Sequence, residues 1–211
     1  TIISLNERDS SALQDLYGYR AHAIFPMALD DQYHYIKPLV DKDDRQEYIL
    51  FVGGLFYANE YGIRWFIKNV VPEIEIKLLI IGRGFEKLKD ELEIQDKVEV
   101  IGSVDNLGPY YTNAKFVIAP IFDGSGMKTK TAEAMMHGKK IIGTKEAFVG
   151  YEDHLPAAGW LCNSKDDFIE RISHANDEVE SPLFDHNLRE IYQVNYSLES
   201  AENKMRIILD N

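Results

Sequence analysis

The sequence predicts an α/β fold with a doubly wound parallel sheet over residues 48–211. Apolar runs rich in β-branched residues occur at residues 48–52, 76–81, 97–101, 115–121, 140–144 and 159–162. Continuous runs of this kind are typical of parallel strands that are buried on both faces. Stretches suited to helices separate the runs, and strands that alternate with helices indicate a doubly wound sheet.

The expected helices follow from spacing and from capping residues. After the first strand, Ile63, Phe66 and Val70 share one face at helical spacing. Asn163 or Ser164 suits the N-cap of a later helix. The remaining helices are expected at residues 85–92, 107–114, 129–137, 165–174 and 197–209.

The first 47 residues follow a different pattern. We expect a strand at residues 1–5, a helix at residues 7–17 that Gly18 ends, and a second strand at residues 21–29. Two strands and one helix cannot bury a core alone. Residues 1–47 are therefore predicted to be the tail end of an N-terminal domain plus an interdomain linker, in a chain excised from a longer protein. The two strands could also pair between copies and form a dimer.

Composition excludes several classes of function. The chain has 211 residues and a net charge of -12, which opposes binding to nucleic acid. Cys162 is its one cysteine, so an intrachain disulfide and a cysteine metal cluster are excluded. No apolar run approaches the ~18 residues that a membrane-spanning helix needs. These features favour a reducing cytoplasm.

A glycine-serine loop before a helix is the most informative local pattern. The loop consists of Asp123, Gly124, Ser125, Gly126 and Met127. A strand, such a loop and a helix start together present backbone N–H groups at the positive end of a helix, which suits an anion. Two lysines and a glutamate follow within two turns. We therefore expect a phosphorylated ligand at this place.

Two familiar glycine motifs do not fit the chain. Residues 124–129 read GSGMKT, which lacks the glycine spacing of a P-loop. Gly82 and Gly84 supply only two glycines of a dinucleotide fingerprint, after a later strand than the first. Gly53 and Gly54 directly follow the first strand and either let a backbone approach a ligand closely or form a tight turn.

Several motifs together resemble a known enzyme family. They are FVGG at residues 51–54, WF at 65–66, LIIGRG at 79–84, VIGSV at 100–104, GSGMKTK at 124–130 and FVGYE at 148–152. In this order they resemble the C-terminal, donor-binding half of a GT-B glycosyltransferase of the large retaining family 4, the glycosyl transferases group 1. The resemblance covers residues 48–210 and implies a Rossmann-like domain.

The resemblance also implies roles for individual residues. Glu133 would accept hydrogen bonds from the ribose hydroxyls, because a carboxylate offers two acceptor oxygens. Lys128 or Lys130 would neutralise the departing diphosphate. The loop N–H groups around Ser125 to Met127 would hold the distal diphosphate and the sugar. Asp123, Gly124 and Thr129, which flank them, are also expected to bind the donor.

The remaining donor contacts are expected at the ends of three strands. Gly53 and Gly54 would approach the donor through their backbone, and Ser103 and Val104 would meet the nucleobase. Arg83 would reach a phosphate, since ligands of such sheets lie outside the carboxyl ends of the strands.

The chain departs from the family pattern in two places. The family motif has two glutamates separated by seven residues, and the first falls at Ser125. Many members carry an arginine and a lysine after the first strand, whereas residues 54–61 contain neither, only Asn59 and Glu60. The phosphate charge must then be met by Arg83, Lys128 or Lys130. Lys128 and Lys130 could alternatively be surface lysines, and Glu133 an ordinary charge in the first turn of a helix.

The predicted function is transfer of a sugar from a nucleotide-diphosphate sugar to a glycan or lipid-linked acceptor, with retention, no cofactor and no metal. The acceptor site would come from the missing N-terminal half, so this chain alone is expected to be inactive. A bacterial polysaccharide is the implied acceptor class, and the cytoplasm, against the inner membrane, the implied location. Two alternatives are a non-catalytic α/β binding module and a GT-B nucleotide-sugar epimerase.

Overall fold

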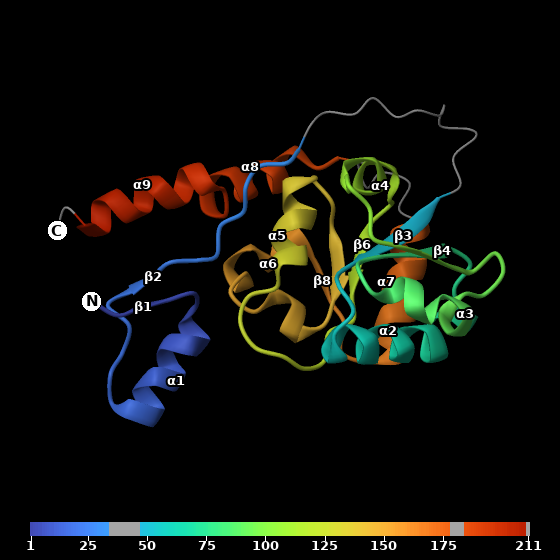
Figure 1. Cartoon of the computed structure of the whole chain (residues 1–211), viewed down its shortest axis with the longest axis horizontal. Helices are drawn as coiled ribbons and strands as arrows, with labels where there is room; N and C mark the ends of the chain where they lie inside the picture. Colours follow the sequence, from blue (N-terminus) through green and yellow to red (C-terminus); the bar gives the residue numbers. More distant parts are fainter. Residues whose placement is uncertain (34–46, 178–183, 210–211) are drawn as a thin grey trace.

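The computed structural model describes residues 1–33, 47–177 and 184–209. Its centre is a six-stranded, all-parallel sheet in the order β5-β4-β3-β6-β7-β8 (Figure 1). The strands are β3 (Tyr48–Val52), β4 (Lys77–Ile81), β5 (Val98–Gly102), β6 (Val117–Ala119), β7 (Ile141–Gly143) and β8 (Gly159–Leu161). Each lies within one of the six predicted runs or extends it by one residue, so the doubly wound α/β prediction is confirmed.

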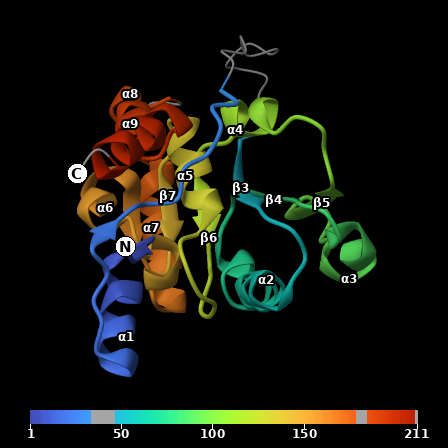
Figure 2. The ribbon, with the colours of Figure 1, turned by 60° about the vertical axis from the view of Figure 1, so that its left-hand side comes forward.

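Helices cover both faces of the sheet (Figure 1, Figure 2). One face carries α2 (Tyr57–Asn69), η3 (Phe85–Leu88), α3 (Lys89–Leu92) and α7 (Lys165–Asp177). The other carries α4 (Gly108–Asn113), α5 (Thr129–Met136), α6 (Leu155–Ala158) and α8 (His186–Asn195). The short 3-10 turns are η2 (Val71–Glu73), η4 (Lys145–Phe148) and η5 (Glu152–His154). The last helix of the described chain is α9 (Leu198–Leu209). Right-handed crossovers require this division, because the strand order runs both ways from β3 and β6.

Two helical regions differ from the expectation. The predicted helix at residues 85–92 is split into η3 and α3, since Gly84 adopts a left-handed conformation and the chain first forms a 3-10 turn. The helix α8 was not predicted. Its cap is local, because the Asp185 carboxylate accepts the N–H groups of Asn187 and Leu188. Its Leu188 and Tyr192, however, are buried against parts of the chain that are distant in the sequence.

The other caps follow the sequence closely. Of the two candidates for the N-cap of α7, Ser164 accepts the Asp167 N–H with its hydroxyl, and the Asp167 carboxylate accepts the N–H of Ser164 in return. This reciprocal pair is a capping box with aspartate as its acid. Ser197 caps α9 in the same way by accepting the N–H of Ser200.

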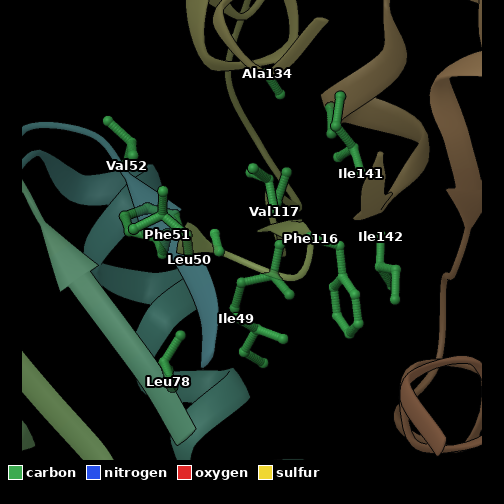
Figure 3. Packing of buried hydrophobic residues seen from close by; sticks show 14 of the residues in the cluster. Ile49, Leu50, Phe51, Val52, Leu78, Phe116, Val117, Ala134, Ile141 and Ile142 are labelled. Carbon is green, nitrogen blue, oxygen red and sulfur yellow. The ribbon is translucent and has the colours of Figure 1, made fainter. Parts of the chain in front are cut away.

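The core lies on both faces of the central strands. Figure 3 shows side chains of β3, β6 and β7 packed together, with Ala134 of α5 above them. Ile49, Leu50, Phe51 and Phe116 are almost completely shielded from solvent. Successive residues of β3 point to opposite faces, and all of them except the half-buried Tyr48 are buried, as the continuous apolar runs predicted.

The close approach of α2 to β6 depends on Gly62. A Cβ atom at this position would lie 1.9 Å from the carbonyl oxygen of Pro120. We expect Gly62→Ala to lower the free energy of unfolding by about 3 kcal/mol, because overpacking against backbone displaces the whole helix. Urea denaturation measures the change, with Lys68→Ala on the exposed face of α2 as the control. Equal stability of the two variants would contradict this packing.

Residues 1–24 lie at the β8 side of the sheet, apart from its strands (Figure 1, Figure 2). They contain β1 (Ile3–Ser4), α1 (Glu7–Tyr17) and β2 (Ala23–Ile24). Within the described residues the two strands pair in parallel with each other and with no further strand. The helix and its stop at Gly18 match the prediction. The strand predicted at residues 21–29 is wrong over most of its length, because only Ala23 and Ile24 pair with β1, and Leu29 forms an isolated bridge to Ser197 instead.

The chain after β2 is attached to the C-terminal helices. Leu29 donates its N–H to the carbonyl oxygen of Tyr196 and accepts from the N–H of Leu198. Arg189 of α8 forms an ion pair with Asp31. Residues 34–46 of the predicted linker lie outside the described residues. In the parts of the chain that the structure describes, no helix has the length and apolar character to cross a membrane.

Candidate donor site

The site lies where the strand order of the sheet reverses. The chain leaves β3 towards β4 and leaves β6 towards β7 on the other side, although β3 and β6 are neighbours. In open α/β sheets the crevice at such a switch point, outside the carboxyl ends of the strands, is the usual ligand site. A pocket of about 280 Å³ opens there. It is lined by Val52, Gly53, Gly54, Ile81, Gly82, Arg83, Ser103, Val104, Leu107, Thr129, Lys130 and Glu133.

Eight of the fourteen predicted site residues therefore line one pocket. They come from the loops after β3, β4 and β5 and from helix α5, which the parallel sheet brings together. A larger pocket of about 400 Å³ lies over the sheet near Tyr48 and Tyr110. It contains the Lys77–Glu99 ion pair and none of the predicted residues. We therefore place the candidate site at the switch point.

Glycines form the wall at the end of β3 and β4. A Cβ atom on Gly82 would lie 1.8 Å from the carbonyl oxygen of Gly53, so the two turns can touch only because this residue is glycine. Leu55 donates its N–H to the carbonyl oxygen of Arg83 and ties the turns together. The Gly53–Gly54 turn is thus both a tight turn and a place where backbone borders the pocket.

Lys130 is a buried cation, which excludes the surface-lysine alternative. Only 6% of its surface is exposed. Its Nζ donates to Oδ1 of Asn59 at 2.7 Å and lies 4.1 Å from the centre of the Phe51 ring. Burial lowers the pKa of Lys130 to about 7, although the nearby Glu133 carboxylate opposes this shift. An anion entering the pocket would meet this ammonium group.

Glu133 lies one turn further along α5. The Tyr111 hydroxyl donates to its Oε2 at 3.3 Å, and the Tyr111 ring in turn stacks on His137 with the centroids 4.4 Å apart. Burial raises the pKa of Glu133, while the Tyr111 hydrogen bond and Lys130 act in the opposite direction. The carboxylate is held by α4, and it borders both the main pocket and a smaller one beside Leu29.

The glycine-serine loop does not line the pocket. Asp123, Gly124, Ser125, Gly126 and Met127 all lie outside its lining. Met127 is buried with its side chain against Gly150. Within the described residues, the N–H groups of Ser125, Gly126 and Met127 donate no hydrogen bond, whereas Gly124 donates to its neighbour Asp123. The loop thus presents backbone donors beside the pocket rather than within it.

Lys128 also lies outside the pocket lining. Its Nζ donates to the carbonyl oxygen of Gly126 at 2.9 Å and forms an ion pair with Glu146 at 3.3 Å. Arg8 of α1 contacts the other oxygen of the same carboxylate at 2.6 Å. Lys128 therefore holds the loop together, and the two lysines that sequence reasoning treated alike have different surroundings.

The base-binding prediction falls on the opposite wall. Ser103 is exposed and Val104 half-buried in the loop after β5, and Arg83 is exposed at the end of β4. This wall offers backbone groups, one guanidinium and an apolar surface from Leu107. Among the described residues there is no cluster of three His, Cys, Asp or Glu side chains that could hold a metal ion.

Sequence reasoning missed two residues that hold the charged groups. Asn59 contacts Lys130, and Tyr111 contacts Glu133. A signal for Asn59 was present, because it falls on the same helical face as Ile63 and Phe66 and is therefore a polar residue on an apolar stripe. Tyr111 had no comparable signal, since a tyrosine near the end of a helix is usual in a core.

Comparisons with known proteins agree with this geometry. A family model described as glycosyl transferases group 1 matches residues 46–177. An uncharacterised 44.6 kDa protein in the cps region of Klebsiella pneumoniae is 31% identical over 110 residues, which make up 46% of this chain and 28% of that protein. The chain thus spans less than a third of the length of this curated relative.

Solved structures of low sequence identity share the fold. HepE of Anabaena in complex with UDP and glucose matches with a TM-score of 0.76 and 12% identity, over 99% of this chain and 62% of that one. WaaG, a glycosyltransferase involved in lipopolysaccharide biosynthesis, matches with a TM-score of 0.72 and 17% identity, over 98% and 62% of the two chains. Since the family model covers more than half of its residues, the chain belongs to the glycosyl transferases group 1 family, with the fold of one half of a GT-B glycosyltransferase.

Proposed function

We propose that the chain is the donor-binding half of a retaining glycosyltransferase that takes a sugar from a nucleotide-diphosphate sugar. The observation that carries this proposal is the pairing of Lys130 with Glu133 in one pocket at the switch point of the sheet. A buried cation suits a diphosphate, and a carboxylate one turn away suits the vicinal hydroxyls of a ribose. Few other ligands need both groups at this spacing.

The donor would lie across the carboxyl edge of the sheet. The nucleobase would meet Ser103 and Val104, the ribose Glu133, and the diphosphate Lys130 and Arg83. The sugar and the distal phosphate would lie beside the N–H groups of residues 125–127, with Lys128 close by. Charge that develops on the departing diphosphate would be stabilised by these lysines, so the site needs no metal ion for this step.

We further propose that residues 1–47 are the end of a preceding domain and its linker. The parallel pair of β1 and β2 around α1 forms a unit that is separate from the six-stranded sheet. Ile3 of β1 and Leu5 directly after it are 40% and 44% exposed, so this unit has apolar surface that a preceding domain would cover. The acceptor site would come from that domain, so we expect the chain alone to bind donors weakly and to transfer no sugar.

The acceptor is proposed to be a growing bacterial polysaccharide or a lipid-linked glycan, handled in the cytoplasm near the inner membrane. The cps-region location of the Klebsiella relative and the lipopolysaccharide role of WaaG support this class. The complexes of HepE with UDP and UDP-glucose make a uridine nucleotide the first ligand to test.

A thermal-shift screen with UDP, GDP, ADP, CMP and their sugar conjugates tests the proposal. A ligand that binds only the folded state stabilises it by about 2.7 kcal/mol at 100 times its Kd, which raises Tm by several degrees. We expect a selective shift with one nucleoside diphosphate and its sugar conjugates. No shift with any of them at millimolar concentration would count against a donor site in this chain.

A further inference from the structure

The structure assigns a second role at the site, which rests on the proposed function: Asn59 is the positioning residue that holds the Lys130 ammonium group at the diphosphate end of the pocket. Asn59 lies on α2 and Lys130 on α5, 71 residues apart in the sequence, and they meet beneath the turn that follows β3. The Asn59 side chain is buried with 4% of its surface exposed.

The hydrogen bonds of Asn59 give its amide one orientation. Its Nδ2 donates to the carbonyl oxygen of Gly54 at 2.7 Å, and its Oδ1 accepts from Lys130 at 2.7 Å. A carbonyl can only accept and an ammonium can only donate, so the reversed amide would lose both bonds. Asn59 therefore connects the glycine turn to the lysine and fixes the position of Nζ relative to the pocket wall.

Gly53 makes room for this arrangement. A Cβ atom there would lie 2.8 Å from Nδ2 of Asn59 and 2.9 Å from Nζ of Lys130. The glycine lets both polar groups reach the space directly under the turn. The ammonium group also lies over the Phe51 ring, and Lys130 lines the pocket.

The side chain of Asn59 is neutral, so it does not cancel the positive charge of Lys130 in the pocket. Residues 54–61 contain no lysine or arginine, so Lys130 is the buried cation available to a diphosphate on this wall. A carboxylate at residue 59 would pair with it and compete with the ligand. Asparagine supplies the hydrogen bond and leaves the positive charge for the phosphate oxygens.

The other charged groups near Lys130 lie on its own helix and across the pocket. Glu133 lies one turn away on α5 and favours the charged form, and Lys128 at the start of α5 opposes it. Arg83 lines the pocket from the loop after β4. From β3 and α2, the groups that face Lys130 are Phe51, Gly53 and Asn59, none of which carries a charge.

The experiment compares Asn59→Leu and Asn59→Asp in the full chain, with Asn69→Leu on the same helix as the matched control. The Asn69 amide donates only to the Trp65 carbonyl of its own helix. Calorimetry measures the affinity for UDP and for uridine, and NMR of the lysine side chains measures the pKa of Lys130 in the ligand-free protein. We expect Asn59→Leu to weaken UDP binding about tenfold, as loss of one bond to a charged group would.

The two readouts separate the positioning role from the donor site itself. Uridine affinity should stay unchanged, and the pKa of Lys130 should fall in Asn59→Leu and rise in Asn59→Asp. An unchanged pKa in both variants would overturn the positioning role, whether or not a nucleotide binds. An unchanged UDP affinity in Asn59→Leu would also overturn it. If the wild-type chain binds no nucleoside diphosphate while the pKa values move as expected, the proposed function fails, and with it a role for Asn59 in binding the donor.

Discussion

Glu133→Ala is expected to weaken the binding of a nucleoside diphosphate about 100-fold, because hydrogen bonds to a charged acceptor contribute about 1.5–3 kcal/mol each and two ribose hydroxyls would lose theirs. The Tyr111 hydroxyl donates to one oxygen of the carboxylate, Oε2, and Glu133 lines the pocket. Since burial raises the pKa of Glu133, affinity should also fall on acidification at a higher pH than for an exposed glutamate.

Binding of two nucleotides, each to the wild type and to Glu133→Ala, tests whether the Glu133 carboxylate contacts the ribose. A nucleotide that lacks the ribose 2′-hydroxyl should bind the wild type more weakly than UDP, whereas Glu133→Ala should bind both equally. Glu190→Gln, on the exposed side of α8, is the control and should bind as the wild type does. If Glu133→Ala still distinguishes the two nucleotides by the full factor, the carboxylate does not contact the ribose.

The fold was predictable because its signals are local. Each strand of the sheet is a continuous apolar run bounded by glycine or by polar residues, and such a run has few alternatives in an α/β protein. The two strands near the N-terminus lacked this property. β2 has two residues, and further along the same apolar segment Leu29 instead contacts Tyr196 at the end of α8. Contacts between residues this far apart in the sequence cannot be inferred from the residues that neighbour them in the chain.

The candidate site likewise has residues that could be predicted from the sequence and residues that could not. Lys130 and Glu133 were identified because they lie in a motif of contiguous residues whose order resembles a family. The distinction between Lys130 and Lys128 was not predictable, since it depends on which lysine faces β3 and which faces Glu146. Tyr111 comes from a helix far away in the sequence and was missed for the same reason, whereas Asn59 could have been found from its place on the apolar face of α2.

Lys130→Met is expected to weaken UDP binding by about 100-fold or more and to leave uridine binding unchanged, because methionine fills the same space without the charge. The desolvated ammonium group destabilises the free protein, so the variant should unfold at a higher urea concentration near neutral pH. A variant that loses ligand affinity while gaining stability is typical of a residue kept for binding. Calorimetry and urea denaturation measure the two effects.

The pH dependence of stability identifies Lys130 without any ligand. Its pKa is about 7 in the folded chain against 10.5 for an ordinary lysine, so between these values the unfolded state binds a proton that the folded state does not. Stability from this group therefore rises by about 1.4 kcal/mol per pH unit above pH 7, and its full penalty is present below pH 7. The difference between wild type and Lys130→Met should show this slope, and Lys68→Met on the surface of α2 should not. A flat difference would mean that Lys130 is solvated and that the pocket is open to water, which would remove the electrostatic basis for diphosphate binding at this wall.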